Sequence, residues 1–255
     1  MVTRRTIKLI KSLQLKKYRK KHGLFLVEGN KLILELLSSE YRIQTLISTP
    51  VFIKTLEDSL ETGNIPEIIT TDEQTVSKAG HLQTNNAALA IVQIPEPTPF
   101  PANPPGYILA LDGVKDPGNL GTILRIADWY GIRHVVCSLE TTDIFNPKVI
   151  SASMGSFLRV STHYEALDTF LKNSSSTVYA ADVGKGSSVH NTQFEQAGIL
   201  LMGSESHGIS PELEPYINFK INIPSFGGAE SLNVSISTGI ICDNILRSVR
   251  NSNYQ

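Results

Sequence analysis

Leu111-Asp112-Gly113-Val114-Lys115-Asp116-Pro117-Gly118-Asn119-Leu120-Gly121-Thr122-Ile123-Leu124-Arg125 is the stretch that decides how the second half of this 255-residue chain folds. An apolar run at 107–111 leads into it, and glycine and proline bound that run, which predicts a buried strand. Pro117 and Gly118 predict a turn, and Asn119 has the side chain of a helix N-cap. Apolar residues then recur at helical spacing. In open α/β sheets, ligands bind beyond the carboxyl end of such a strand, so we expect chemistry here.

Two further polar, glycine-rich stretches follow strand-like runs downstream. The first is Gly203-Ser204-Glu205-Ser206-His207-Gly208-Ile209, after an apolar run at 198–202. The second is Ile223-Pro224-Ser225-Phe226-Gly227-Gly228-Ala229-Glu230-Ser231-Leu232-Asn233-Val234-Ser235, after a run at 219–223. Because the carboxyl ends of parallel strands meet at one edge of a sheet, we expect all three stretches to meet there.

Taken together, the three stretches resemble the motifs of the SpoU (TrmH-type) RNA 2'-O-ribose methyltransferases of the SPOUT superfamily. Asn119 with Arg125 resembles the first motif, Gly-x-Glu-x-x-Gly at 203–208 the second, and Ile-Pro with Ser-Leu-Asn at 223–233 the third. The likeness covers residues 107–250. A second resemblance, to the family's substrate-binding domain, rests on Lys17-x-Arg19-Lys20-Lys21-x-Gly23-x-Phe25-x-Val27-Glu28-Gly29.

The resemblance implies an S-adenosylmethionine-dependent enzyme that methylates a ribose 2'-hydroxyl of ribosomal or transfer RNA. It implies a trefoil-knotted cofactor site and a homodimer through the C-terminal domain. The implied catalytic residues are Asn119, Arg125, Glu205, Ser231 and Asn233. The implied cofactor-binding residues are Leu201, Met202, Gly203, Ile223, Pro224, Gly228 and Leu232. No metal is expected, because a sulfonium already makes its methyl group electrophilic.

Alternatives remain for single residues and for the whole chain. Asn119 alone is more often a structural cap, Arg125 could pair with Asp128, and Ser231 and Asn233 could simply start a helix. A dinucleotide-binding Rossmann site is excluded, since no Gly-x-Gly-x-x-Gly follows a strand. The rival from another class is a non-catalytic RNA-binding protein that retains the methyltransferase fold.

Charge is distributed unevenly along the chain. The formal net charge is only −1, yet residues 1–27 carry nine basic side chains and no acidic one. A basic segment on an acidic body is typical of an arm that binds phosphates, although a solvated helix face is the alternative. The predicted RNA contacts are Lys16, Lys17, Arg19, Lys20 and Lys21.

Composition is that of a globular protein, with 41% hydrophobic and 18% charged residues and no apolar run that would span a membrane. Interleaved lysines follow the first five residues in place of an apolar signal core, so we expect a cytoplasmic protein. Cys137 and Cys242 are isolated from each other in the sequence and are expected to be buried free thiols. The final helix carries a wide apolar surface, which also indicates a homodimer.

The predicted fold class is α/β with two domains. Residues 1–94 form a small α/β domain, 95–106 a proline-rich linker, and 107–255 a mostly parallel sheet with helices on both faces. We expect one amphipathic helix over 4–21. The other helices are expected at 31–37, 51–60, 72–79, 119–130, 147–154, 165–171 and 231–249, and strands at 25–27, 43–47, 67–69, 88–94, 107–111, 134–137, 158–161, 178–181, 198–202 and 219–223.

Overall fold

The computed structural model describes residues 2–57, 65–82, 85–102 and 104–252, with side chains through Val249. The chain divides into two compact units. Unit 1 comprises 1–97 together with 143–158, and unit 2 comprises 98–142 together with 159–255. The chain therefore enters unit 1 a second time, between two strands of unit 2. Among the described residues, no helix is both long and apolar enough to cross a bilayer.

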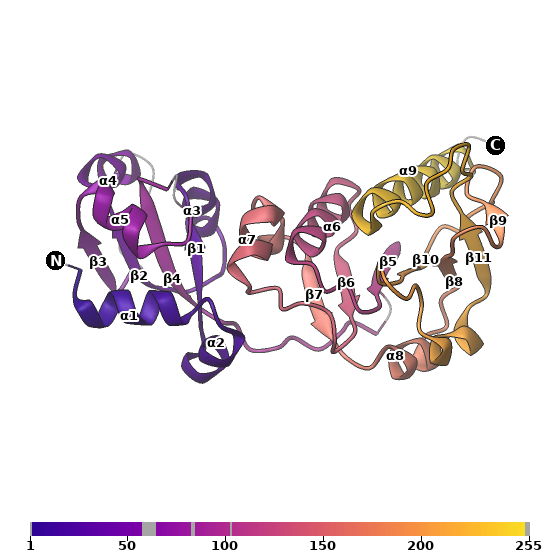
Figure 1. Cartoon of the computed structure of the whole chain (residues 1–255), viewed down its shortest axis with the longest axis horizontal. Helices are drawn as coiled ribbons and strands as arrows, with labels where there is room; N and C mark the ends of the chain where they lie inside the picture. Colours follow the sequence, from indigo (N-terminus) through magenta and orange to yellow (C-terminus); the bar gives the residue numbers. More distant parts are fainter. Residues whose placement is uncertain (1, 58–64, 83–84, 103, 253–255) are drawn as a thin grey trace. The chain divides into compact units, whose positions relative to one another are not determined.

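Unit 1 is built on a four-stranded sheet in the order β1-β4-β2-β3 (Figure 1). Strand β4 is antiparallel to both β1 and β2, whereas β2 and β3 are parallel. The strands are β1 (Leu24–Glu28), β2 (Ile43–Ser48), β3 (Glu67–Thr70) and β4 (Ala88–Gln93). The helices are α1 (Arg4–Ser12), α2 (Lys16–His22), α3 (Asn30–Leu37), α4 (Pro50–Glu57), α5 (Glu73–Ala79) and α7 (Pro147–Ser153), and a 3-10 turn, η2, spans Ser156–Leu158. The predicted end of α4, at 58–60, lies outside the described residues.

The prediction of one helix over 4–21 is wrong, because the chain forms α1 and α2 with a break at residues 13–15. The break has a specific cause. The Arg19 guanidinium donates from Nη1 to the main-chain oxygens of Leu13 and Gln14, both at 2.8 Å, so these carbonyls are bound by a side chain at the break. Gly23 then ends α2 in the left-handed conformation, at φ 62°.

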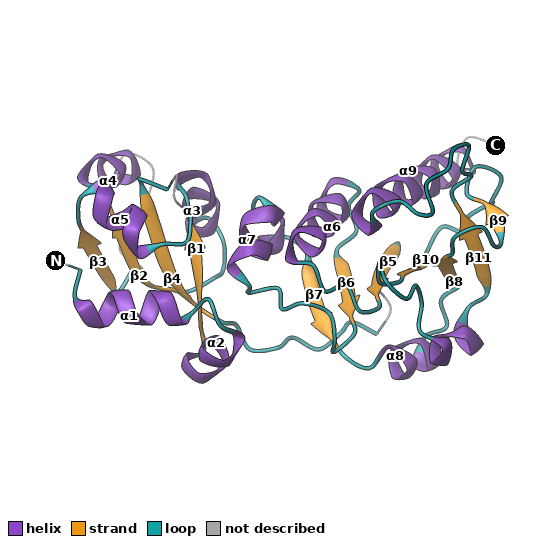
Figure 2. Ribbon diagram, in the orientation of Figure 1, coloured by secondary structure: helices purple, strands orange, loops and turns teal. Residues whose placement is uncertain are grey.

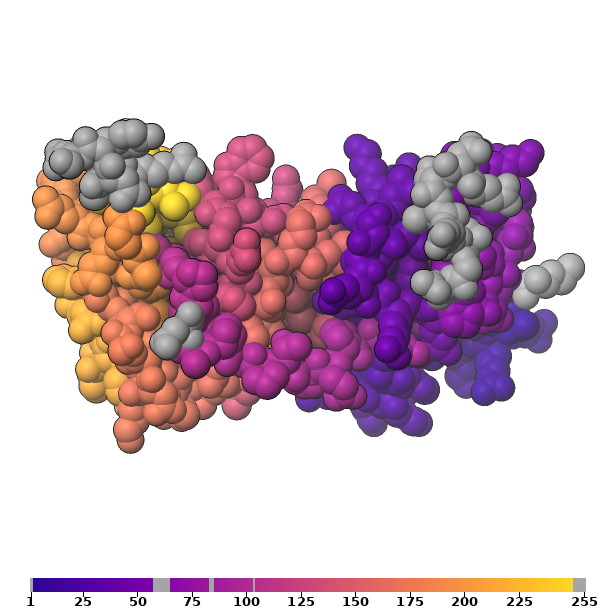
Figure 3. All heavy atoms as spheres, turned by 180° about the vertical axis from the view of Figure 1, so that it is seen from behind, coloured from indigo at the N-terminus to yellow at the C-terminus, as the bar shows by residue number. Residues whose placement is uncertain are grey.

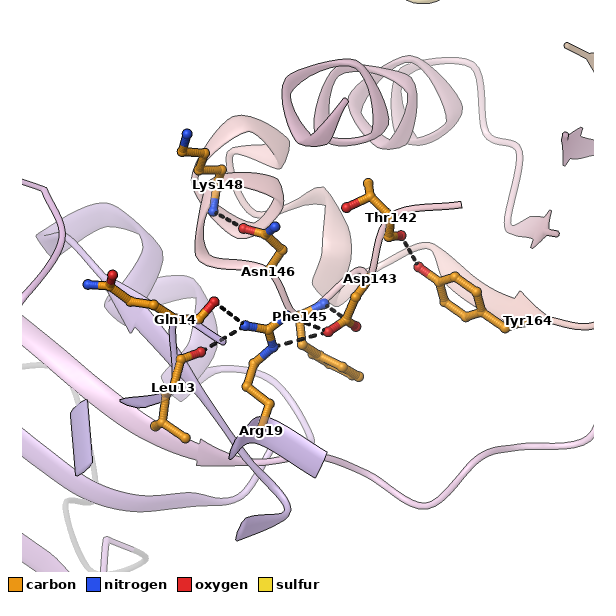
Figure 4. Close-up of polar contacts among 9 residues, drawn as sticks. All are labelled: Leu13, Gln14, Arg19, Thr142, Asp143, Phe145, Asn146, Lys148 and Tyr164. Atoms are coloured by element: carbon orange, nitrogen blue, oxygen red, sulfur yellow. Dashed lines mark hydrogen bonds and ion pairs between the residues drawn. The ribbon is translucent and has the colours of Figure 1, made fainter. Parts of the chain in front are cut away.

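Arg19 also holds residues 143–158 in unit 1 (Figure 4). Its Nη2 and Nε donate to Asp143 Oδ2 at 2.6 and 3.0 Å, and only 2% of the side chain is exposed. Next to the ion pair, the Phe25 ring packs against Phe145 at a centroid distance of 4.7 Å and against Phe157 at 6.2 Å. Arg19 is therefore withdrawn from the proposed RNA contacts, because the guanidinium is buried and bound within the protein.

Unit 2 contains a seven-stranded sheet in the order β7-β6-β5-β10-β8-β11-β9, and every neighbouring pair is parallel (Figure 2). Helices α6 and α9 pack together on one face, and α8 and η3 lie together on the other. The strands are β5 (Tyr107–Leu111), β6 (His134–Cys137), β7 (Ser161–Tyr164), β8 (Val178–Ala181), β9 (Ser187–Ser188), β10 (Gly198–Met202) and β11 (Phe219–Asn222). The helical elements are α6 (Pro117–Trp129), α8 (Leu167–Asn173), η3 (Pro211–Tyr216) and α9 (Val234–Ser252). The predicted α/β class is confirmed.

Three predicted boundaries in the second half are corrected. The strand expected at 158–161 is β7, which begins only at Ser161, because residues 156–158 form η2 in unit 1. Helix α6 begins at Pro117 and α9 at Val234, two residues before and three residues after the expected starts. The proline-rich segment from Pro95 to Pro99 is exposed at the surface (Figure 3).

Asp143→Ala should destabilise unit 1 strongly, because it leaves the buried Arg19 charge without its partner. Losses after breaking a buried ion pair are about 3–5 kcal/mol, and urea unfolding measures them. The matched control is Asp128→Ala, which removes the partly exposed pair between Asp128 and Arg159, at 2.9 Å. Pairs of that kind contribute about 0–1 kcal/mol. Equal losses in the two variants would contradict the structural role assigned to Arg19.

Candidate functional site

A cavity of about 440 Å³ lies in unit 2, where strands β8, β10 and β11 end. This position is the carboxyl edge of the parallel sheet, at which the sequence predicted a ligand site. Its walls come from three separate segments of the chain, 181–183, 202–208 and 221–241. The lining residues are Ala181, Asp182, Val183, Met202, Gly203, Ser204, Glu205, Gly208, Ile221, Ile223, Pro224, Ser225, Phe226, Gly227, Ala229, Glu230, Ser231, Leu232, Val234, Ser237 and Ile241.

Gly203 begins a tight turn on the wall of the cavity. Ser204 and Gly208 exchange two main-chain hydrogen bonds, of 2.9 and 3.0 Å, which bring the chain back onto Gly203. A Cβ atom on Gly203 would lie 2.2 Å from the Gly208 carbonyl carbon, so only glycine fits. The stretch at 111–125 is bound to the chain just after this turn, because Asp112 Oδ2 accepts from the Ser210 main-chain N–H at 2.7 Å.

A chain of hydrogen bonds joins the three polar stretches that the sequence singled out. The Asn119 side-chain amide donates to Glu205 Oε1, and the Asn233 amide donates to Asn119 Oδ1 at 2.9 Å. Asn233 Oδ1 in turn accepts from the Ser235 main-chain N–H at 3.0 Å, at the start of α9. These side chains are separated by up to 114 residues in the sequence and meet as expected.

Asn119 is not the N-cap of α6, contrary to the sequence prediction. That position is occupied by Asp116, whose Oδ1 accepts from the Asn119 main-chain N–H at 2.8 Å. Both residue types are good caps, but α6 begins two residues earlier than expected, with Pro117 at its first position, where proline is favoured. The Asn119 side chain is consequently free to bind Glu205 and Asn233.

Arg125 lies outside this chain of hydrogen bonds, exposed on α6. It follows Asn119 by six residues, which is about 240° around a helix with 3.6 residues per turn, so the two side chains leave different faces. Asp128, the alternative partner considered from the sequence, forms an ion pair with Arg159. Ser231 is exposed on the cavity wall.

The predicted cofactor-binding residues gather mostly at the cavity. Met202, Gly203, Ile223, Pro224 and Leu232 line it. Leu201 and Gly228 do not line the cavity. Leu201 belongs to the hydrophobic core of the sheet, and in the loop it is Gly227, not Gly228, that contributes to the cavity wall.

Sequence reasoning missed the contribution of Ala181, Asp182 and Val183 to the cavity. Ala181 is the last residue of β8, and Asp182 and Val183 follow it; β8 lies between β10 and β11 in the sheet. The order of the strands in the sheet places these residues at the cavity, and that order could not be read from the sequence. The only signal in the sequence was a polar residue, Asp182, directly after the strand predicted at 178–181.

The charged side chains on the cavity wall are all acidic. They are Asp182, Glu205 and Glu230, and no lysine or arginine occurs among the described residues that line the cavity. Asp182 is partly neutralised by Lys220 Nζ at 3.4 Å. The wall therefore favours a ligand that carries positive charge.

Neither cysteine is arranged as a nucleophile. Burial raises the pKa of the Cys242 thiol to about 12, and burial likewise raises the pKa of Cys137. Both are buried free thiols, as predicted. Within the described part of the chain, no three histidine, cysteine, aspartate or glutamate side chains are grouped as a metal site would require.

Comparison with known proteins gives a consistent result over both halves of the chain. A family model described as the SpoU rRNA methylase family matches residues 106–243, and one described as the MRM3-like substrate binding domain matches 4–90. The chain is 29% identical over 234 residues to the 23S rRNA (guanosine(2553)-2'-O)-methyltransferase RlmP of Bacillus subtilis, covering 91% of this chain and 92% of RlmP.

Two solved structures resemble the whole chain. A TrmH-family protein from Porphyromonas gingivalis superimposes with a TM-score of 0.85 at 37% identity, covering 96% of this chain and 98% of that one. An AdoMet-bound rRNA methyltransferase from Sinorhizobium meliloti gives 0.85 at 28% identity, covering 97% and 96%.

Gly203→Ala should abolish binding of S-adenosylmethionine, because the new methyl group overlaps the Gly208 carbonyl and opens the turn. Gly228→Ala is the matched control, since a Cβ atom at that position meets nothing within 4 Å. Isothermal titration with the cofactor measures both affinities. If Gly203→Ala binds as tightly as Gly228→Ala, the turn is not part of the cofactor site.

Proposed function

The chain belongs to the SpoU rRNA methylase family, and from this premise we propose that it transfers a methyl group from S-adenosylmethionine to a ribose 2'-hydroxyl of ribosomal RNA. The observation that carries the proposal is the hydrogen-bonded chain Glu205–Asn119–Asn233, which joins the three motif stretches beside the cavity. RlmP, a relative over nine-tenths of the chain, is named for this reaction. A non-catalytic RNA-binding protein finds no support in these comparisons. Transfer RNA is a second class of substrate to be tested.

The cavity fits the proposed cofactor in size and in charge. Its volume of about 440 Å³ lies within the usual range for small-molecule sites. The acidic wall complements the positive sulfonium, and the turn at Gly203 and the main chain at Ile223 and Leu232 would hold the adenosine. We further propose that the loops around this site form the trefoil knot expected from the family.

The protein's own residues would align the nucleophile and stabilise its charge. When bound, the cofactor supplies an electrophilic methyl group. Asn119 and Asn233 fix the start of α9 against the Glu205 turn, which gives the cavity a defined shape. A guanidinium group is a poor proton acceptor, so we assign Arg125 the role of binding the target phosphate and stabilising the developing alkoxide.

The direct test supplies tritiated S-adenosylmethionine with ribosomal and transfer RNA transcribed in vitro, followed by mapping of 2'-O-methylated nucleotides. We expect label in ribosomal RNA at a ribose oxygen. Label on a base instead of a ribose, or cofactor binding without any transfer to RNA, would contradict the proposed reaction.

We also propose that the protein is a cytoplasmic homodimer through unit 2. Apolar side chains are exposed around the start of α9. Leu232, in the loop before the helix, is 48% exposed, and Ile236, in its first turn, is 55% exposed. Burial of such a surface against a second copy would stabilise a dimer. A monomeric mass in sedimentation at micromolar concentration would exclude it.

Arg125→Lys should retain part of the methyl-transfer rate, whereas Arg125→Ala should lose on the order of a hundredfold or more, as for other preorganised donors to developing anions. The reason is that lysine preserves the charge but not the planar fork of donors. Single-turnover transfer with saturating cofactor and RNA measures the chemical step, and cofactor affinity should be unchanged in both. Equal losses would favour a role specific to the guanidinium, and a normal rate in Arg125→Ala would remove Arg125 from the mechanism.

Replacing the four exposed lysines of α2 by alanine should weaken binding to all RNAs alike. Lys16, Lys17, Lys20 and Lys21 are all exposed. Each lost phosphate contact should reduce the slope of log affinity against log salt by about 0.7–0.9. The control variant removes the same charge at the exposed Lys54, Lys78, Lys172 and Lys185. An identical salt slope in the two variants would assign the α2 lysines to a solvated helix face.

A further inference from the structure

Phe226 is almost fully in solvent although it belongs to the wall of the cavity. It lies in the loop between β11 and α9, and 97% of the residue is exposed. Gly227 and Gly228 follow it, and a Cβ atom on either would meet nothing within 4 Å. An uncovered aromatic ring loses the stabilisation that burial would provide. The ring therefore stands at the rim of the cavity, and burial against the described residues does not account for an aromatic residue there.

The rim around Phe226 is apolar and acidic. Val183 is 67% exposed and Leu232 48% exposed, and both line the same cavity. The charged residues of the wall are carboxylates, among them Glu230, four residues after Phe226. Phosphate groups are repelled by such a rim. A nucleotide bound here would accordingly present its base and ribose to the protein and keep its phosphates away.

The interior side of the cavity is lined by buried residues, so the nucleophile has to enter from the solvent side, and Phe226 forms part of that rim. Met202, Ile221 and Ile241 form the interior wall and are buried. A ribose that reaches the cofactor must come from the solvent side, and its base then lies at the rim. Proteins recognise unpaired RNA bases mainly by stacking them on aromatic side chains. Phe226 is the one aromatic residue among the described residues that line the cavity.

We propose that Phe226 is the platform on which the base of the target nucleotide stacks while its ribose faces the methyl group. The proposal rests on the proposed function and specifies which part of the RNA the cavity rim binds. Because every base has a π face, stacking on Phe226 positions the nucleotide without selecting its identity. Phe226 thus acts by placing the 2'-hydroxyl, and the base preference has to arise from other contacts.

The first experiment measures methyl transfer with the RNA that accepts label in the assay above. Phe226→Ala and Phe226→Leu should raise the apparent KM for RNA by about five- to a hundredfold, the range found for the loss of one base–aromatic stack. Phe226→Trp should stay close to the unaltered protein. Cofactor affinity by titration and the mass by sedimentation should not change. Trp129→Ala is the matched control, because Trp129 is a second exposed aromatic residue of unit 2 that does not line the cavity.

Each other result would overturn the proposal in a different way. A normal KM in Phe226→Leu would mean that apolar volume suffices and that no stacking occurs. A weaker affinity for S-adenosylmethionine would make Phe226 part of the cofactor site, and an altered mass would make it a contact between two copies of the chain.

A second measurement does not depend on turnover and therefore separates this proposal from the proposed function. Phe226→Trp in a Trp129→Phe background leaves one indole, since the chain has a single tryptophan. Stacking of RNA bases should quench its fluorescence in the presence of cofactor. Absence of quenching at RNA concentrations that saturate binding would overturn the role of Phe226 even if the enzyme methylates RNA. Quenching without methyl transfer would instead contradict the proposed reaction.

Discussion

The hydrogen bond from Asn233 to Asn119 is the contact on which the geometry of the site depends. It joins the start of α9 to the first turn of α6, and the other end of the Asn119 amide holds the turn that carries Glu205. An amide is suited to this position because it donates and accepts at the same time. Three segments that are distant in the sequence are thereby fixed at one edge of the sheet, and two of them, those of Glu205 and Asn233, line the cavity.

The sheet explains why these segments meet. Strands β5 and β10 are neighbours although 86 residues separate the Asn119 and Glu205 that follow them. All strand pairs in unit 2 are parallel, so the loops after β5, β10, β8 and β11 leave from the same edge. Buried apolar strands set the positions, and the polar loops then supply the chemistry. Because the buried strands hold the fold together, the loops can contain exposed and glycine-rich segments without loss of the fold.

Much of this arrangement could be predicted from local sequence patterns, and two of the errors share one cause. The strand–turn–helix at 107–125 and the meeting of Asn119, Glu205 and Asn233 follow from apolar runs and from motif order. The break between α1 and α2 could not be predicted, because it depends on Arg19, whose carboxylate partner Asp143 is 124 residues away. The wall formed by Asp182 was missed because strand order places it there. Local propensity thus predicts the elements, while distant partners decide where helices break.

Arg19 and Arg125 show the limit of reading charge from sequence. Arg19 lies in the most basic segment of the chain, yet it is buried and bound to Asp143, whereas the lysines around it are exposed. A charge pattern therefore indicates that a surface is basic without indicating which cations form it. Arg125 is the opposite case, an exposed cation on a helix whose neighbouring turn carries the hydrogen-bonded Asn119. Because the charged residues of the cavity wall are carboxylates and Arg125 lies outside that wall, the acidic and basic side chains of the proposed site belong to separate surfaces of unit 2.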